Sequence, residues 1–411
     1  MAKRPLRHCV LRGCVTLAAT ALLAVCLLFG FLWLEHRSAL TLPTPSGPFA
    51  IGRTIYDWRD PAHVDTLAPL PGTKRELLVW IWYPAASPAG ATGEYVPPEL
   101  RPSAAPAGNG NIWTLLTRDV SHVRGHSIRN AAVSPHQRSY PLVIFRAGAS
   151  ASVVNYTTLA EDLASHGYVV VGFDAPYRTT RVVFPDGRII GRAQQNNPET
   201  CVVLERSRME RCARRVLEAW AGDIGFVLDR VAQLNASDSS GQFTGRIDMS
   251  RVGVFGHSFG GATAAQFCHD DARCRAGIDI DGAPHGSVVQ EGVRQPFMFL
   301  LSDHENDRHA MSVQIKSDIQ SIYDHSPRDR RLRVAIRGAF HLMFSDDPAL
   351  LKSSVVRGAL RLLGKLRIDA RRQLEVTAFC VHTFFDAYLT GSGASLPVMT
   401  SPLYPEIQVL P

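Results

Sequence analysis

The sequence lacks the short motifs of several large classes of enzymes and binding proteins. It has no C-x-x-C pair, which argues against a zinc ribbon or a thioredoxin-like site. It has no H-E-x-x-H, Walker A or G-x-G-x-x-G pattern, which removes the usual zinc protease and nucleotide-binding classes. Charged residues make up 20% and hydrophobic residues 45%, so the chain is neither disordered nor fibrous. We therefore expect a globular protein, and no motif implies a metal or an organic cofactor.

The chain has eight cysteines and no pair of them in a metal or redox motif, and their use fits an exported protein without proving export. The part of the chain after the N-terminal segment holds an odd number of cysteines, namely Cys201, Cys212, Cys268, Cys274 and Cys380. Cys268 and Cys274 flank a polar turn, which predicts a short disulfide loop between them. Cys380 lies in an apolar helical pattern, which predicts a buried free thiol.

Positive charge is in modest excess, with a net charge of +7. Much of that excess precedes the first apolar run, where no acidic residue offsets Lys3, Arg4, Arg7 and Arg12. The rest of the chain is only weakly basic, so nucleic-acid binding loses most of its support. A later basic cluster at residues 328–333 is expected to be a solvated loop.

Residues 15–34 form an apolar run of 20 residues without charge or proline. A helix of that length spans about 30 Å, the thickness of a bilayer core. An uncleaved signal anchor is favoured over a cleaved signal peptide, because apolar signal regions usually have about 7–15 residues and residues 32–35 offer no small-x-small cleavage site. The basic residues before the apolar run place the N-terminus in the cytoplasm, so the rest of the chain, here called the body, faces the periplasm or the outside. If the segment is cleaved, the body is secreted.

The chain is accordingly divided into three parts. Residues 1–37 are the signal anchor or signal peptide, and the Pro/Ser/Gly-rich residues 38–50 are predicted to be a linker. Residues 51–411 are predicted to form one catalytic domain. No internal repeat is found in it.

Apolar strands and helices alternate along this domain. Strands are expected at residues 77–83, 141–145, 168–173, 252–255, 276–280, 296–301 and 332–336. Helices are expected at residues 156–165, 204–234, 259–268, 311–323, 350–363 and 373–389. Residues 178–199 are expected to form an excursion over the sheet edge. Continuous apolar strands that alternate with helices predict an α/β fold with a mainly parallel sheet covered on both faces.

One motif carries the chemistry. Residues 256–260 read Gly-His-Ser-Phe-Gly, with an apolar strand before them and a helix rich in small residues after them. This context is that of the nucleophile elbow of α/β-hydrolases, which predicts Ser258 as the nucleophile. The alternative is a tight turn whose serine only caps the helix.

A serine hydroxyl needs a base to take its proton. In this fold the base follows the nucleophile and the acid along the chain, and His341 comes just after the last predicted strand. The other downstream histidines are in weaker positions, namely His285, His304, His309, His325 and His382. The residues alone leave two candidates for the acid, Asp281 and Asp303, each of which follows a predicted strand.

The sequence resembles the plasma-type platelet-activating factor acetylhydrolases and their bacterial, dienelactone hydrolase-like relatives. The matching features are Asp281 lying 23 positions after Ser258, and the stretches at residues 77–84, 140–145, 183–187 and 384–391. The resemblance implies an α/β-hydrolase fold, hydrolysis of short acyl esters that include acetylated phospholipids, and Asp281 as the acid. Asp279 is expected on the opposite face of its strand, in a structural hydrogen bond.

An esterase also needs two backbone N–H groups for the oxyanion. One is expected from Phe259, the residue after the nucleophile. The resemblance places the second on Ala149, in a loop that reads His-Gly-x-Gly in the family. Here Ala147 replaces the histidine and Ser150 replaces the second glycine, so the sequence departs from the family pattern.

These features predict a serine carboxylic ester hydrolase that acts on a small-molecule or lipid ester and reaches the membrane through its N-terminal segment. A broader carboxylesterase or polyester hydrolase remains open. A third hypothesis is a catalytically silent α/β-hydrolase that serves as a binding module, which a fluorophosphonate probe would distinguish.

Overall fold

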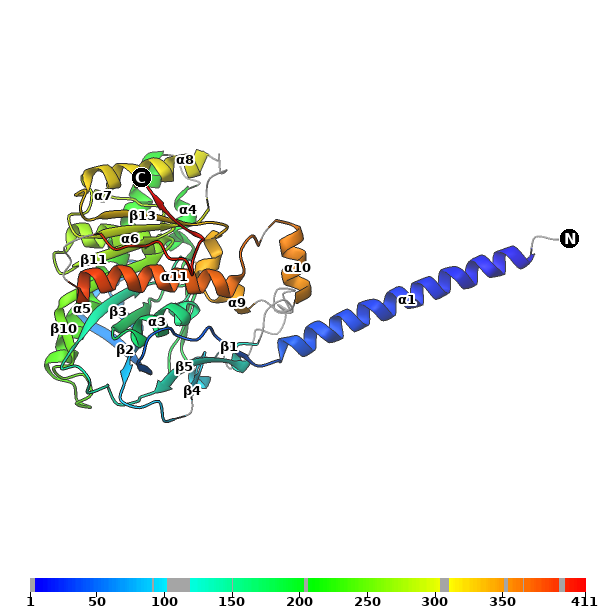
Figure 1. Cartoon of the computed structure of the whole chain (residues 1–411), viewed down its shortest axis with the longest axis horizontal. Helices are drawn as coiled ribbons and strands as arrows, with labels where there is room; N and C mark the ends of the chain where they lie inside the picture. Colours follow the sequence, from blue (N-terminus) through cyan, green and yellow to red (C-terminus); the bar gives the residue numbers. More distant parts are fainter. Residues whose placement is uncertain are drawn as a thin grey trace.

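The computed structural model describes residues 4–90, 92–101, 119–149, 151–202, 206–303, 310–350, 354–364, 366–391 and 396–411. Their core is a mixed sheet in the order β1-β5-β2-β3-β7-β6-β10-β11-β12-β13-β14, with β4 paired to β5 (Figure 1). The strands are β1 Leu40–Thr41, β2 Ala50–Val64, β3 Lys74–Ala85, β4 Thr92–Glu94, β5 Val123–Arg129, β6 Tyr140–Arg146, β7 Val169–Asp174, β10 Ile247–His257, β11 Ala276–Ile280, β12 Phe297–Leu301, β13 Arg331–Ile336 and β14 Ile407–Leu410. A separate hairpin joins β8 (Arg181–Val183) to β9 (Ile189–Gly191).

The middle of the sheet is parallel. Strands β7, β6, β10, β11, β12 and β13 all pair in parallel, whereas β3 pairs antiparallel with β7 and β14 antiparallel with β13. Every residue of β6, β7 and β11 is buried, because helices cover both faces. The carboxyl ends of these parallel strands therefore meet at one edge, where loops can carry reactive side chains.

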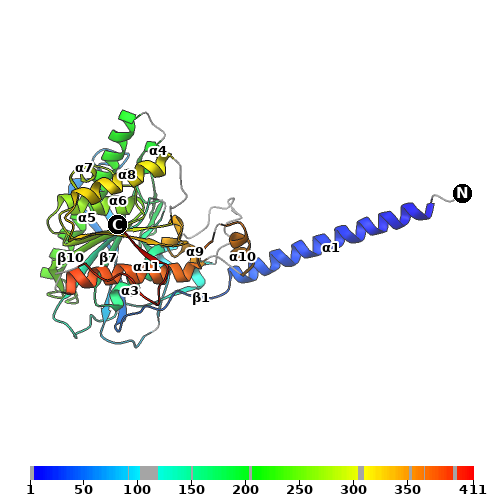
Figure 2. The same ribbon diagram turned by 45° about the horizontal axis from the view of Figure 1, so that its top comes forward.

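Two sets of helices cover the sheet. The apolar residues of α3 (Thr157–Ser165) and α11 (Ala370–Phe385) pack on one face, and those of α5, α6, α7 and α8 pack on the other (Figure 2). The remaining bounds are α1 Arg4–His36, α4 Pro198–Val202, α5 Arg206–Ala236, α6 Phe259–Asp270, α7 Val288–Glu291, α8 Ala310–His325, α9 Asp347–Leu350 and α10 Ser354–Leu362, with the short turns η1 Pro98–Leu100, η2 Val120–His122, η3 Val153–Tyr156, η4 Gln194–Asn196, η5 His341–Phe344 and η6 Asp386–Thr390.

Several strands near the sheet edges were not predicted from the sequence. β2 and β5 carry charged residues and a mixed burial pattern, so they lack the continuous apolar run that marks the inner strands. β14 has four residues, too few for a periodic signal. The predicted excursion at residues 178–199 contains the β8–β9 hairpin.

Helix α1 projects away from the body (Figure 1). By length and composition, its portion Leu11–His36 is the candidate membrane span among the described residues, with a mean hydropathy of 2.5 and 6% of the apolar window buried. A signal sequence near the N-terminus passes the same test. The helix therefore fits either a signal or an anchor.

Residues 38–50, expected as a linker, pack against the body. Leu40–Thr41 pairs with β5, and Leu42 is buried. Both the backbone N–H and the hydroxyl of Ser46 donate to Asp162 of α3. The composition of this segment suggested flexibility, but its polar groups find fixed partners across a separation of 116 residues.

Two disulfides are present among the described residues. Cys268 and Cys274 are bonded, as the polar turn between them predicted. Cys201 and Cys212 are also bonded and join α4 to α5, a pairing that the sequence analysis did not predict. Cys380 is a buried free thiol, as expected from its apolar surroundings.

Candidate active site

Ser258 stands at the turn between β10 and α6, at the carboxyl edge of the sheet. Its φ is 57°, in the left-handed region that non-glycine residues rarely occupy. A Cβ on Gly256 would lie 2.2 Å from the carbonyl carbon of Gly260, and a Cβ on Gly260 would lie 2.2 Å from the carbonyl oxygen of Arg146. The turn therefore accepts only glycine at these two positions and presents the serine at its tip.

His341 follows β13 and begins η5. Its Nε2 lies 3.1 Å from Ser258 Oγ, and its Nδ1 lies 2.7 Å from Asp281 Oδ2. A carboxylate only accepts hydrogen bonds, so Nδ1 carries the proton. The lone pair of Nε2 is then free to accept from the Ser258 hydroxyl, which is the arrangement that proton abstraction requires.

Asp281 follows β11 and also has a positive φ, 52°. Its carboxylate is buried and accepts hydrogen bonds from the backbone N–H and the hydroxyl of Ser302, at 2.8 and 2.7 Å. These bonds hold the carboxylate in the orientation that meets His341. Ser302 was not predicted, since nothing in its sequence context distinguishes it from other serines.

The other two aspartates have different partners. Asp303, the alternative acid, accepts a hydrogen bond from the backbone N–H of Gly338 at 2.9 Å and so anchors the loop that leads to His341. Asp279 accepts from the Gly282 N–H at 2.8 Å, which is the structural hydrogen bond expected for it. Burial raises the pKa of Asp279 well above its ordinary value.

Of the other candidate bases, three belong to the described residues. The Nδ1 of His325 lies 2.8 Å from the carbonyl of Ser321, and that of His382 lies 2.9 Å from Asp162. Burial lowers the pKa of His285. His304 and His309 lie outside the described residues.

The segments that carry the two expected oxyanion donors meet at the nucleophile. Phe259 begins α6 directly after Ser258, and the loop of residues 146–149, here called the oxyanion loop, passes close by. A Cβ on Gly148 would lie 3.2 Å from Ser258 Cβ. Ala149 and Phe259 belong to one small apolar cluster, in which Phe259 packs edge-on against Trp220. Ser150, where the family pattern has its second glycine, lies outside the described residues.

The excursion over the sheet edge touches this loop. Arg192, which follows β9, donates to the carbonyl oxygen of Ala149 at 2.6 Å. That bond uses the carbonyl and leaves the Ala149 N–H available for another acceptor. Arg192 therefore links this segment to the oxyanion loop.

His257, the residue before the nucleophile, and Tyr156 of η3 were both missed by the sequence analysis. The hydroxyl of Tyr156 lies 2.6 Å from His257 Nδ1, and His257 Nε2 lies 3.0 Å from the carbonyl oxygen of His341. Burial, followed by the nearby His341, lowers the pKa of His257 to about 3. The histidine was visible in the motif, but its partner is 101 residues away along the chain.

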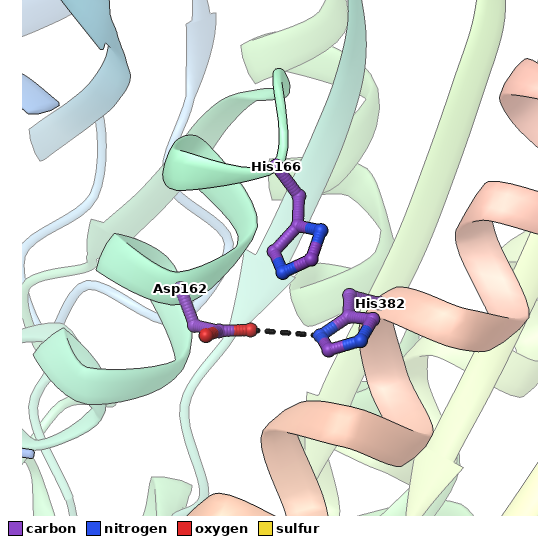
Figure 3. A group of neighbouring side chains, drawn as sticks. All are labelled: Asp162, His166 and His382. Carbon is purple, nitrogen blue, oxygen red and sulfur yellow. Dashed lines mark hydrogen bonds and ion pairs between the residues drawn. The ribbon is translucent and has the colours of Figure 1, made fainter. Parts of the chain in front are cut away.

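A group of potential metal ligands lies elsewhere, between α3 and α11. Figure 3 shows Asp162 on α3 and His166 just after it, both close to His382 on α11. The oxygens of Asp162 are already used, since Oδ1 accepts from Ser46 and Oδ2 from His382. The two imidazoles are stacked at 3.9 Å with planes 19° apart, so their lone pairs do not converge on one point. We call this group, which comprises Ser46, Asp162, His166 and His382, the Asp162 cluster. It fits a closed hydrogen-bonded group and not a metal site.

The comparisons of sequence agree on one family. The profile of the family described as platelet-activating factor acetylhydrolase, isoform II, matches residues 38–181 and 190–391. A probable 1-alkyl-2-acetylglycerophosphocholine esterase of Arthroderma benhamiae is 27% identical over 91% of this chain and 94% of its own. A platelet-activating factor acetylhydrolase of Cavia porcellus is 28% identical over 61% of this chain and 58% of its own.

A solved structure is also similar. The ferulic acid esterase of Streptomyces cinnamoneus superposes with a TM-score of 0.70 and 26% identity, over 91% of this chain and all of that one. The relatives are thus ester hydrolases in both the sequence and the structural comparison.

Proposed function

The chain belongs to the platelet-activating factor acetylhydrolase isoform II family of carboxylic ester hydrolases, and on that premise we propose that Ser258, His341 and Asp281 form its catalytic triad. The observation that carries the proposal is the continuous pair of hydrogen bonds from Ser258 through His341 to Asp281, at 3.1 and 2.7 Å. The strained backbone of Ser258 supports it further, because strain of this kind persists where a fold holds a reactive group in place.

In this mechanism Ser258 Oγ attacks the ester carbonyl while His341 Nε2 takes the hydroxyl proton. Collapse of the tetrahedral intermediate expels the alcohol, which receives that proton from His341, and leaves an acyl group on Ser258. Water then attacks the acyl-enzyme by the same route and releases the acid. Asp281 keeps the imidazole in the required tautomer and stabilises its charged form.

The oxyanion of each intermediate is stabilised by the backbone N–H groups of Phe259 and Ala149. Phe259 directly follows the nucleophile, Ala149 directly follows Gly148, which packs against it, and the side chains of both are buried in the same cluster. Backbone donors held in this way need no reorganisation as charge develops on the oxygen. The departures at Ala147 and Ser150 change side chains and leave a backbone donor in place.

The substrate class proposed is a short acyl ester, with an acetylated phospholipid as the leading candidate. It rests on the relatives, which are named for the hydrolysis of 1-alkyl-2-acetylglycerophosphocholine or platelet-activating factor. A second candidate is a broader carboxylesterase, including a polyester hydrolase, and the structural similarity to a ferulic acid esterase favours it.

Helix α1 is proposed to be an uncleaved signal anchor that holds the catalytic domain, residues 51–411, on the outer side of a membrane. The support is its exposed apolar surface and the basic residues that precede the apolar run. A cleaved signal would make the same domain secreted.

One activity panel tests the proposal. Purified protein is assayed with p-nitrophenyl esters of rising chain length, an acetylated phospholipid and a feruloyl ester. The expected result is the highest kcat/KM for acetyl esters, with loss of activity and of fluorophosphonate labelling in Ser258→Ala. A preference for the feruloyl ester would favour the second candidate. Labelling that survives in Ser258→Ala would show that Ser258 is not the nucleophile.

A further inference from the structure

A buried chain of three hydrogen bonds runs behind the proposed nucleophile. The backbone N–H of Gly148 donates to the hydroxyl of Tyr156 at 3.4 Å. That hydroxyl lies 2.6 Å from Nδ1 of His257, and Nε2 of the same ring lies 3.0 Å from the carbonyl oxygen of His341. The chain therefore begins in the oxyanion loop and ends on the backbone of the proposed base.

The chemistry of the end groups sets the direction of every bond. A carbonyl oxygen only accepts, so Nε2 of His257 must carry the proton. Burial keeps the pKa of this ring at about 3, so the imidazole is neutral and Nδ1 must accept. The hydroxyl of Tyr156 then donates to Nδ1 and accepts from the N–H of Gly148. One tautomer of one histidine thus satisfies all three bonds at once.

Water does not replace these bonds easily. Tyr156 is 1% exposed and His257 is 4% exposed. A buried polar group that loses its partner costs more than the bond itself contributes, because it stays unsolvated. Loss of one member should therefore shift the backbone at an end of the chain.

Both ends of the chain touch reacting groups. Gly148 is packed so closely that a Cβ there would lie 3.2 Å from Ser258 Cβ, and it directly precedes the proposed donor Ala149. The ring of His257 lies 4.7 Å from the ring of His341. A shift at either end would misplace the oxyanion donor or the base relative to Ser258.

From this geometry we propose that Tyr156 and His257 are positioning residues, which lock the oxyanion loop to the backbone of the catalytic base. The inference rests on the proposed triad and adds two residues that do not touch the substrate. Loss of this lock should lower kcat more than it weakens substrate binding. The reason is that the oxyanion donor and the base stabilise the transition state more strongly than they stabilise the bound substrate.

The first test is Tyr156→Phe, with Tyr168→Phe as its matched control. Tyr168 is equally buried as a residue, and its hydroxyl donates to the partly exposed carboxylate of Asp386 at 2.6 Å, so the control also loses one tyrosine hydrogen bond, but away from the site. In Tyr156→Phe, kcat for p-nitrophenyl acetate should fall by about 10- to 100-fold with KM changed by less than about threefold. Tyr168→Phe should keep kcat within about twofold at temperatures where both variants are folded.

Binding of a trifluoromethyl ketone supplies a readout that a purely structural role would not move. Ser258 Oγ adds to the ketone carbon of this inhibitor while His341 takes the hydroxyl proton, and the ketone oxygen becomes an oxyanion. The Ki should therefore rise in Tyr156→Phe by about the factor by which kcat falls. Equal kcat and Ki in Tyr156→Phe and the wild type would overturn the proposal. So would a loss of kcat that only follows the fraction of unfolded protein.

Variants of His257 separate the two halves of the chain. His257→Gln brings an amide N–H near the place of Nε2 and keeps the bond to His341, whereas His257→Asn brings an oxygen near the place of Nδ1 and keeps the bond to Tyr156. His257→Leu loses both. The expected order of kcat is wild type, then the two amides, then leucine, and wild-type kcat in His257→Leu would contradict the role.

The outcome also distinguishes this inference from the proposed function. If Ser258→Ala keeps its activity, the triad itself is wrong. If Ser258→Ala is inactive while Tyr156→Phe and His257→Leu keep their kcat, the triad stands and the positioning role fails.

Discussion

Two regions of this protein contain the same three residue types, serine, histidine and aspartate, in hydrogen-bonded contact. At the sheet edge, His341 bridges Ser258 and Asp281. In the Asp162 cluster, between α3 and α11, an aspartate binds His382 at 2.9 Å, and the hydroxyl of Ser46 lies 2.9 Å from Nε2 of His166. The inventory of side chains alone therefore does not distinguish a reactive site from a structural one.

The geometry of the two groups differs in what the serine does. The Ser46 hydroxyl lies 2.8 Å from Asp162 Oδ1 and 2.9 Å from His166 Nε2. Because a carboxylate only accepts, the hydroxyl proton goes to Asp162, and His166 Nε2 donates to the Ser46 oxygen and cannot act as a base toward it. Ser258 instead faces an imidazole nitrogen with a free lone pair, on a strained turn beside backbone donors. Reactivity depends on which atom the hydroxyl faces and on what surrounds it.

Replacing the two serines should give the largest contrast. Ser258→Ala should lower kcat by about 10⁴- to 10⁶-fold, because only binding and the oxyanion donors remain. Ser46→Ala should keep wild-type kcat and lose about 1 kcal/mol of stability with its hydrogen bond. Steady-state kinetics on acetyl esters and urea unfolding of both variants measure this, and a low kcat in Ser46→Ala would erase the distinction between the two regions.

The aspartates sharpen the comparison. Asp281→Asn should cost on the order of 10⁴-fold in kcat, since the imidazole loses the partner that fixes its tautomer. Asp303→Asn keeps an acceptor for the Gly338 N–H and should cost less than about 10-fold. Asp162→Asn should change stability and spare kcat. Kinetics of the three variants rank them, and a larger loss in Asp303→Asn than in Asp281→Asn would transfer the acid to the later strand.

The histidines of the two regions should differ in how they couple stability to pH. The pKa of His257 is about 3 in the folded chain and about 6.5 when unfolded, so the unfolded state gains a proton below pH 6.5 that the folded state excludes. Stability from this group is complete above that pH and falls by about 1.4 kcal/mol per pH unit toward pH 3. Burial, followed by His382, also lowers the pKa of His166, with the same sign.

Urea unfolding between pH 7.5 and 4.5 tests this coupling. His257→Gln should flatten the slope of stability against pH more than His166→Gln does, because the ring of His166 is partly exposed. Equal slopes in wild type and His257→Gln would show that the buried ring is not excluded from protonation.

The smallest effect on catalysis is expected at the N-terminus. Deletion of residues 1–38 leaves both Ser46 and the sheet-edge site in place, so kcat should be unchanged while membrane association is lost. Full-length protein should stay with membranes in high salt, since apolar burial and not charge holds it there. N-terminal sequencing of the mature protein completes the test, because a start between residues 34 and 48 would identify a cleaved signal.

The inner strands were predictable because each is a continuous apolar run bounded by turn residues. The elbow at Ser258 was predictable for a related reason, since strand, glycine, serine and small-residue helix are neighbours in sequence. The edge strands β2, β5 and β14 were not predictable, because they are half exposed or short and their pairing with distant strands defines them.

The sequence alone determined what is local, namely the alternation of strands and helices, the sharp turn that exposes Ser258, and the chain order in which Asp281 and His341 follow it. Only the tertiary structure decided what is long-range. It turned Asp281 and not Asp303 toward His341, joined Tyr156 to His257, and fixed Ser46 on Asp162. The physical reason is that hydrogen-bond geometry depends on atoms brought together from distant parts of the chain, and no local pattern encodes which partner a buried polar group will find.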